Sequence, residues 1–301
     1  MLQFSRSLMA VVIVASLFLL PGQVLSQQWR PIKGGKAYGI SGLGLIDQSG
    51  TSASFLIVHD NKKKNEGRLA MITIEGNKEP RYSPLNWPDN IELPVDLEAL
   101  TCVPGEEESS FMALASEGKV YHIKVDASRT CVSVLKIFDL PNVSKASNFE
   151  GLALQKIDGK LLAVWAHRGN NDDPAKIHWG LLDLATYGFS QTGSATLKVP
   201  WPVKADVRHV SDLKVDPTGV LFISSASDPG DNGPFQSAVY IAGVFSFGVT
   251  QVIFRRSVEF VRLCHFEYRK VEALALVPGR SGGMVFATDD ENMGASFYLD
   301  W

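Results

Sequence analysis

Residues 97–105 have the sequence LEALTCVPG, and residues 271–279 have the closely matching sequence VEALALVPG. Each stretch is followed by an apolar run, at 111–115 and 284–287, that ends in polar or acidic residues. Shorter versions of the same pattern begin at three other places: Ser41, Phe149 and Val210. A motif that recurs at intervals through a chain of 301 residues indicates a repeat architecture.

The spacing of the repeat predicts the fold. Its equivalent positions are Gly42, Glu98, Glu150, Asp212 and Glu272. Each unit contains short β-branched or alternating runs separated by Gly, Pro, Asp and Asn, which is typical of antiparallel strands joined by turns. In the second unit these runs are 97–103, 111–115, 119–125 and 131–138. Four strands in each of five units predict an all-β, five-bladed β-propeller, or a six-bladed one if one unit is split.

The two ends of the chain predict how the ring closes. The last unit ends after its third strand, at 297–299, while residues 29–40 contain a spare run near the start. We expect this N-terminal run to supply the missing fourth strand. Segment 251–268 is the hardest to assign, and no linker divides residues 27–301, which are therefore expected to form one domain.

The first 26 residues have the pattern of a secretory signal peptide. Arg6 precedes an apolar run from Leu8 to Leu20, and Val24 and Ser26 place small residues before a cut at Gln27. The run is shorter than the roughly 20 residues that a spanning helix needs. We therefore expect an exported protein, periplasmic or secreted, with no transmembrane anchor after the signal is removed.

The charge balance excludes one class of partner. The chain has 29 Lys and Arg against 32 Asp and Glu, a net charge of −3, so it has no positive excess that would attract nucleic acid. Its three cysteines are too few for a disulfide scaffold. A chain of this length can instead be held by its apolar core.

Acidic residues recur where the first strand of a unit begins. They are Glu98, Glu150, Asp212 and Glu272, with Gly42 at the corresponding place in the first unit. First strands line the channel of a propeller, so these carboxylates are expected to converge on its axis. Because like charges repel in a poorly solvated place, a cation would stabilise them. Oxygen ligands favour Ca²⁺, with Mg²⁺ or Mn²⁺ as alternatives.

Loops that follow the second strands should lie on the same face. His167 and Arg168 open a polar loop that includes Asn170, and a similar loop includes Asn232. Arg208 and His209 precede Asp212 on the same rim. Arginine suits anionic groups, and asparagine can bind polar ones, so Arg168, Arg208, Asn170 and Asn232 are candidate substrate-binding residues. His167 and His209 are candidate catalytic bases.

The strand-start motifs resemble those of a known family. Residues 41–43, 96–100, 150–153 and 211–213 are similar to the blade starts of secreted bacterial propellers called esterase-like phytases. They are more distantly similar to gluconolactonase and paraoxonase-type propellers. The resemblance implies a divalent metal held by acids around the axis, in which Glu98, Glu150, Asp212 and Glu272 match the axial positions.

Two functions follow from these observations. The first is an exported, Ca²⁺-dependent hydrolase that acts on a small anionic phosphoester, or on an ester or lactone, at the axial face. The second is a non-catalytic propeller that binds a protein or glycan on that face, with a structural metal or none. Metal-dependent turnover would distinguish the first from the second.

Overall fold

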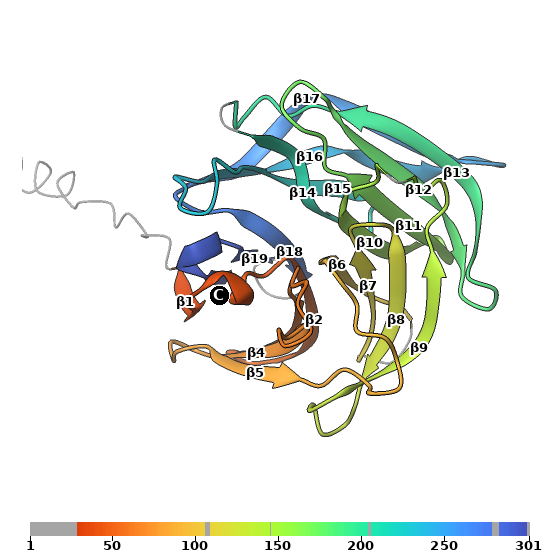
Figure 1. The fold of residues 1–301 in the computed structure, drawn as a ribbon. Helices are drawn as coiled ribbons and strands as arrows, with labels where there is room; N and C mark the ends of the chain where they lie inside the picture. The colour runs from red at the N-terminus through yellow and green to blue at the C-terminus, as the bar shows by residue number, and fades with distance from the viewer. Residues whose placement is uncertain (1–28, 106–108, 145, 204–205, 279–282, 300–301) are drawn as a thin grey trace, which may run out of the picture.

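The computed structural model describes residues 29–105, 109–144, 146–203, 206–278 and 283–299. In this part of the chain, five four-stranded antiparallel sheets surround a common centre (Figure 1). The predicted all-β, five-bladed β-propeller is confirmed. The expected signal peptide lies outside the described residues. Among the described residues, no helix has both the length and the hydropathy to span a membrane.

Each of the first four blades is a consecutive four-stranded meander. Blade one contains β2 (Gly42–Ser49), β3 (Ser52–Val58), β4 (Leu69–Glu75) and β5 (Arg81–Leu85). Blade two contains β6 (Leu97–Cys102), β7 (Ser110–Ala115), β8 (Lys119–Val125) and β9 (Val132–Asp139). Blade three contains β10 (Phe149–Ile157), β11 (Lys160–His167), β12 (Ala175–Asp183) and β13 (Gly188–Leu197). Blade four contains β14 (Val207–Val215), β15 (Val220–Ser227), β16 (Gln236–Phe247) and β17 (Val252–Glu267).

The fifth blade joins the two ends of the described chain. Its strands β18 (Val271–Val277), β19 (Gly283–Thr288) and β20 (Ala295–Leu299) are completed by β1 (Arg30–Lys33), which pairs with β20. The expected N-terminal fourth strand is therefore present. Two 3₁₀ turns, η1 (Lys36–Tyr38) and η2 (Glu291–Met293), follow β1 and β19.

The core lies between neighbouring blades, where the inner faces of adjacent sheets pack together. Phe55 of blade one and Phe297 of blade five, for example, have ring centroids 5.1 Å apart and are both fully buried. The first strands β2, β6, β10, β14 and β18 lie innermost and contact one another around the ring (Figure 1). A methyl group at Gly42 would lie 2.6 Å from the backbone nitrogen of Leu100. Gly151 approaches Leu213 of the next blade in the same way, so glycine at these two positions allows the inner strands to pack closely.

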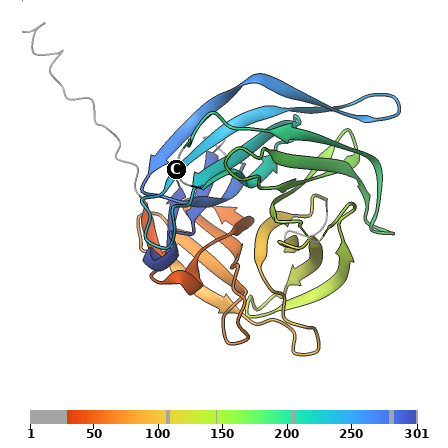
Figure 2. The ribbon, with the colours of Figure 1, turned by 45° about the horizontal axis from the view of Figure 1, so that its top comes forward.

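The segment that was hardest to assign is an edge strand. Residues 252–267 form β17, which pairs with β16 and, with it, projects as a long hairpin beyond the rest of the ring (Figure 2). Gly243 pairs with Arg256 and Ile241 with Val261, so the intervening residues of β17 bulge out of the ladder. A bulge interrupts the alternation of apolar and polar residues that identifies a strand in a sequence. This interruption is why the segment was hard to assign.

The three cysteines form no disulfide. Cys102, Cys131 and Cys264 are all free and partly buried. The fold is therefore held by its apolar core and its sheet hydrogen bonds.

Candidate functional site

Three acidic residues reach the axial face through the same local irregularity. In β6, Leu97 pairs with Ala115 and Ala99 with Leu114, so Glu98 is an extra residue in the ladder. Glu150 in β10 and Glu272 in β18 occupy the same kind of bulge. A bulge re-aims the side chain of the extra residue. The three carboxylates are buried, with exposed fractions of 8%, 2% and 2%.

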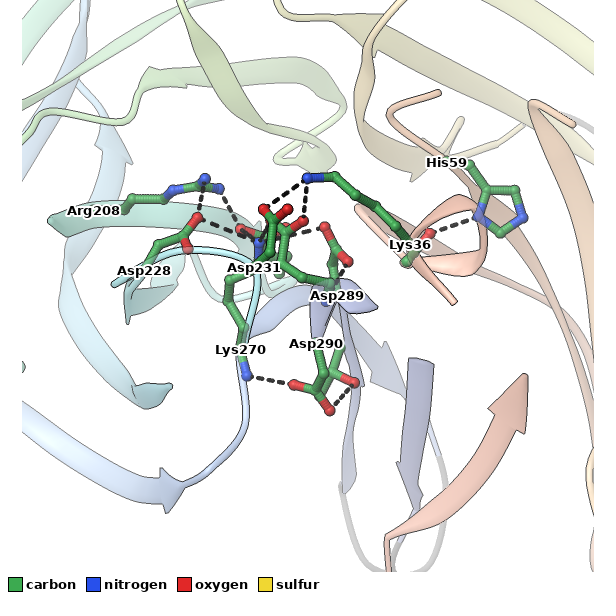
Figure 3. Close-up of polar contacts among 12 residues, drawn as sticks. Lys36, His59, Arg208, Asp228, Asp231, Lys270, Asp289 and Asp290 are labelled. Carbon is green, nitrogen blue, oxygen red and sulfur yellow. Dashed lines mark hydrogen bonds and ion pairs between the residues drawn. The ribbon is translucent and has the colours of Figure 1, made fainter. Parts of the chain in front are cut away.

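Two of these acids share a partly buried arginine. The Arg208 guanidinium contacts Glu272 directly, and its Nη1 lies 4.0 Å from Oε2 of Glu150. Its Nη2 donates to Asp228 at 2.6 Å (Figure 3). Glu150 also accepts a hydrogen bond of 3.2 Å from Arg168, whose side chain remains 30% exposed. Glu150 and Glu272 therefore both lie in ion pairs with arginine, although burial still raises the pKa of Glu272 to about 8.

A fully buried lysine lies among a further group of carboxylates. Lys270 Nζ lies 2.5 Å from Glu291, 3.4 Å from Asp289, 3.4 Å from Asp228 and 3.7 Å from Glu272. Burial would lower the pKa of this lysine, but these carboxylates outweigh burial and raise it. Lys36 of η1 reaches Asp231 and Glu291, at 2.9 and 2.8 Å, and so ties the N-terminal segment to blades four and five. We call Arg208, Asp228, Lys270, Glu272, Asp289 and Glu291 the ion-paired side (Figure 3).

The opposite side of the axial face contains carboxylates with little compensation. Asp60 follows β3 directly, Asp96 precedes β6, and each offers a carboxylate oxygen within 4.8 Å of one from Glu98. We call Asp60, Asp96 and Glu98 the carboxylate cluster. Among the described residues, the Asp60 and Glu98 carboxylates have no hydrogen-bond donor and no ion-pair partner. Asp96 pairs with Lys62, at 3.0 Å, through a lysine side chain that is 66% exposed.

The cluster has an unfavourable electrostatic environment. Burial, followed by the neighbouring carboxylates of Glu150, Asp96 and Asp60, raises the pKa of Glu98 well above its usual value. Burial and Glu272 raise the pKa of Asp60 to about 6. Arg68 is buried nearby, but its guanidinium donates to the backbone carbonyls of Pro94, Glu66 and Lys63. Among the described residues, the one cation in ion-pair contact with the cluster is therefore Lys62, whose side chain is largely exposed.

Asp212 does not join the other acids. Arg208 pairs with Ala226, whereas Asp212 pairs with Ser224, because β14 contains two extra residues between these positions. The Asp212 carboxylate instead accepts hydrogen bonds of 2.8 Å from Lys214 and 2.7 Å from the backbone nitrogen of Leu274. The basic side chain of Arg208 therefore reaches the axis from this strand.

The candidate catalytic histidines lie away from the axis. His209 is 2% exposed and bonds through Nε2 to the carbonyl of Asn171 at 2.7 Å. His167 lies 3.3 Å from the carbonyl of Ala146 through Nε2, and its Nδ1 accepts from the backbone of Gly169. Both imidazoles hold loops in place. The adjacent Arg168 points the other way, into the site.

The two candidate asparagines lie in the rim loops. Asn170 forms an isolated backbone bridge with Asp173, and its side chain is exposed. Asn232 accepts a hydrogen bond of 3.1 Å from Asn292, so it links the loops of blades four and five. Of the four candidate substrate-binding residues, Arg168 and Arg208 therefore lie closest to the axial carboxylates.

The residues differ in their ability to hold a divalent cation. Glu150 and Glu272 already pair with arginine or lysine, and Asp212 with Lys214. The carboxylate cluster offers three oxygens with the hard-donor chemistry that Ca²⁺ prefers. Two oxygens bound at about 2.3–2.6 Å lie within roughly 5 Å of each other, as these do. Asp60, Asp96 and Glu98 therefore fit a cation better than the other axial acids.

The comparisons with known proteins show a similarity of fold alone. No family model and no curated protein matches the chain. Among solved structures, a protein titled a glycoside hydrolase has a TM-score of 0.52 and 11% identity, over 89% of this chain and 61% of that chain. A family-43 β-1,3-galactosidase with galactodeoxynojirimycin has a TM-score of 0.49 and 8% identity, over 90% of this chain and 92% of that chain. An α-L-arabinanase from Penicillium chrysogenum, with arabinobiose, has a TM-score of 0.47 and 8% identity, over 90% of this chain and 96% of that chain.

These findings correct the family expected from the sequence. No family model matches, and the similar structure with a TM-score of 0.52 is titled a glycoside hydrolase, so the resemblance to esterase-like phytases, and the more distant one to gluconolactonases and paraoxonases, is wrong. The strand-start motifs encode the inner strand and bulge of a propeller blade. They therefore carry information about architecture and not about a particular family.

Proposed function

We propose that the protein is a hydrolase that cleaves glycosidic bonds at its axial face with the help of a divalent cation. The observation that carries this proposal is the convergence of Glu98, Glu150 and Glu272 from three blades beside two arginines. Glycosidases use carboxyl groups in different electrostatic environments to activate water and to protonate the leaving oxygen. The glycan class comes from the titles of the structurally similar proteins, whose likeness to this chain is one of fold.

Glu150 is the candidate base. Arg168 and Arg208 lie 3.2 and 4.0 Å from its carboxylate and fix the orientation of that group. An ionised, oriented carboxylate can accept a proton from the attacking water. Arg168 is the more exposed of the two arginines, at 30% against 18%, so it is the one placed to donate to a sugar hydroxyl or carboxylate.

The candidate cation ligands are Asp60, Asp96 and Glu98. Their oxygens lie within 4.8 Å of one another, and Glu98 is 8% exposed without a donor among the described residues. When bound, Ca²⁺ would supply positive charge and open coordination positions for sugar oxygens, with Mg²⁺ or Mn²⁺ as smaller alternatives. Of the four ligands predicted from the sequence, this set retains Glu98. It leaves out Glu150, Asp212 and Glu272, because arginine or lysine side chains pair with them.

We also propose that the protein acts outside the cytoplasm. The support is the N-terminal pattern of an arginine, an apolar run and small residues before Gln27. N-terminal sequencing of the exported protein should begin at Gln27. A protein that retains Met1 would contradict export by cleavage.

Activity measurements test the reaction class. The purified protein is assayed against aryl glycosides, polysaccharides, aryl phosphates and esters, each with Ca²⁺ and with a chelator. We expect glycoside turnover that the chelator removes, and a loss of roughly 10²- to 10⁴-fold in Glu150→Gln. Glu117→Gln is the matched control, because Glu117 is exposed in the turn between β7 and β8.

The other outcomes would change the assignment. Hydrolysis of phosphates or esters alone would contradict the glycan substrate. Glycan binding without turnover, unaffected by Glu150→Gln, would support a non-catalytic propeller instead.

A further inference from the structure

We propose that the flank of blade three carries a second binding site, specific for a small sugar that bears an anionic group. A cavity of about 630 Å³ lies there, lined by residues of β11, β12 and β13 and of the connection that precedes β10. This volume is within the range of about 300–1,000 Å³ that is usual for small-molecule sites. Neither the arginines nor the carboxylates of the axial face line it.

The charge of the cavity favours an anion. Its lining includes Lys176, His167 and His178 but no acidic residue, although acids outnumber Lys and Arg in the chain as a whole. Lys176 is exposed and has no ion-pair partner among the described residues, so its ammonium group is available. A carboxylate or phosphate ester that pairs with Lys176 would meet no like charge in the lining.

The neutral part of the lining suits sugar hydroxyls. Thr192 and Ser194 present hydroxyl groups from β13 that form no side-chain hydrogen bond among the described residues. Each hydroxyl can both donate and accept, which matches the bonding of a polyol. The cavity therefore combines one cationic group with several bifunctional polar groups.

His178 is held in this cavity by ring contacts alone. It stacks on Trp165, with centroids 5.7 Å apart and planes at 11°, and meets Phe149 edge to face at 6.4 Å. Among the described residues, it forms no hydrogen bond. Burial, then Lys176 and His167, lower the pKa of His178 to about 4. Its neutral ring therefore offers one donor and one acceptor from a fixed position.

His167 plays a different part in the same cavity. Its two ring nitrogens are occupied by Ala146 and Gly169, each at 3.3 Å, so it shapes the wall but has little left to offer a ligand. The next residue, Arg168, points into the axial site and pairs with Glu150. The end of β11 therefore separates the lateral cavity from the axial face, and the two sites can be tested independently.

Binding measurements with defined probes test the proposal. Glucuronate, glucose 6-phosphate, glucose and inorganic phosphate are titrated into the purified protein by calorimetry and by ligand-detected NMR. We expect saturable binding of at least one anionic sugar, weaker binding of inorganic phosphate and weaker still of glucose. The carboxylate and phosphate arms identify which anionic group the cavity prefers.

Three variants locate the binding. Lys176→Gln should weaken it roughly tenfold, because a charge-assisted hydrogen bond is lost. His178→Phe keeps a ring between Trp165 and Phe149 but removes the nitrogens, and should weaken binding roughly fivefold. Lys160→Gln, at the other end of β11, is the matched charge control and should leave affinity unchanged.

Several results would overturn the proposal. They are the absence of saturable anionic-sugar binding, an affinity for glucose or inorganic phosphate equal to that for both anionic sugars, or unchanged affinity in Lys176→Gln. Glu150→Gln should retain the binding, so failure of the axial hydrolase leaves this result unaffected. Unfolding midpoints of the variants show whether each one is folded when its affinity is measured.

Discussion

On the side of the axial face formed by blades four and five, Arg208 and Lys270 lie directly among the carboxylates. On the side formed by blades one and two, Asp60 and Glu98 face each other without a donor among the described residues. Both sides remove carboxylates from water, which is costly unless the charge is compensated. The ion-paired side is partly compensated by Arg208 and Lys270, although burial still raises the pKa of Glu272 to about 8 and that of Asp289 to about 6. The carboxylate cluster has the exposed Lys62 as its one ion-pair partner among the described residues.

The contrast separates a structural role from a functional one. Removing one partner of a buried ion pair leaves an uncompensated buried charge and strongly destabilises the folded protein. The ion-paired side therefore has a structural role in the loops of blades four and five. An incompletely compensated cluster instead has free capacity for binding. The proposed cation site therefore follows from Asp60 and Glu98, which lack a partner among the described residues, and not from the number of acids on the face.

The largest effect is expected from removing the buried lysine. Lys270→Met leaves the carboxylates of Asp228, Glu272, Asp289 and Glu291 without their shared cation and should lower the free energy of unfolding by about 3–5 kcal/mol. Urea denaturation measures the change. Lys36→Gln is the control: its side chain is 57% exposed, so its loss should cost about 1 kcal/mol or less. Equal effects of the two variants would break the distinction between buried and exposed pairs.

A smaller effect with a defined pH dependence is expected at Asp228. Burial alone would raise the pKa of this carboxyl, but Lys270 and Arg208 together hold it below its ordinary value. Ionised Asp228 therefore stabilises the fold at neutral pH, and this contribution is lost as the pH falls below the ordinary aspartate value toward the lowered one. Asp228→Asn should cost about 1–3 kcal/mol at pH 7 and progressively less in acid.

A control checks this pH dependence. Asp231→Asn removes a carboxylate that pairs with Lys36 but is 57% exposed, and should change stability by less than about 1 kcal/mol at any pH. Unfolding free energies are compared from pH 3 to pH 7. A cost of Asp228→Asn that stays constant or grows in acid would contradict the assigned direction of the pKa shift.

The smallest effect is expected at the cation that contacts the carboxylate cluster. Lys62 is 66% exposed, so Lys62→Gln should change the free energy of unfolding by less than about 1 kcal/mol. It should nevertheless tighten Ca²⁺ binding by roughly three- to fivefold, because a competing positive charge 3.0 Å from Asp96 is removed. Lys78→Gln, which disrupts another exposed pair, is the control. Weaker Ca²⁺ binding in Lys62→Gln would contradict the proposed ligands.

The architecture was largely predictable because short local sequence patterns determine the strands and turns. Turn residues between short β-branched runs predicted β6 to β9 within one or two residues of their ends. The missing strand after Leu299 and the spare run near Arg30 predicted the closure of the fifth blade. The placement of Glu98, Glu150 and Glu272 on one face followed from the same repeat, since each precedes a matching apolar strand.

The site was predicted less completely because register and side-chain partners are not local. The extra residues of β14 shift Asp212 away from the axis, and the matching motif at 211–213 carries no sign of them. A usable signal was the basic residue two positions from the acid, since alternate residues share a face of a strand. Lys214 beside Asp212 follows this rule and forms the observed pair. Lys270 also lies two positions from the acid Glu272, but it precedes β18 and reaches that acid through the bulge. The sequence also gives no side-chain direction: the adjacent residues His167 and Arg168 point in opposite directions, and the role of the histidines as bases stays a prediction.

Calorimetric titration with Ca²⁺ tests the difference between the two sides most directly. The protein, prepared in chelator and then freed of it, is compared with Glu98→Gln and with Glu272→Gln, which removes an equally buried axial acid from the ion-paired side. The account predicts one Ca²⁺ bound per chain, binding abolished in Glu98→Gln, and binding retained in Glu272→Gln. No binding to the unaltered protein, or equal loss in both variants, would contradict it.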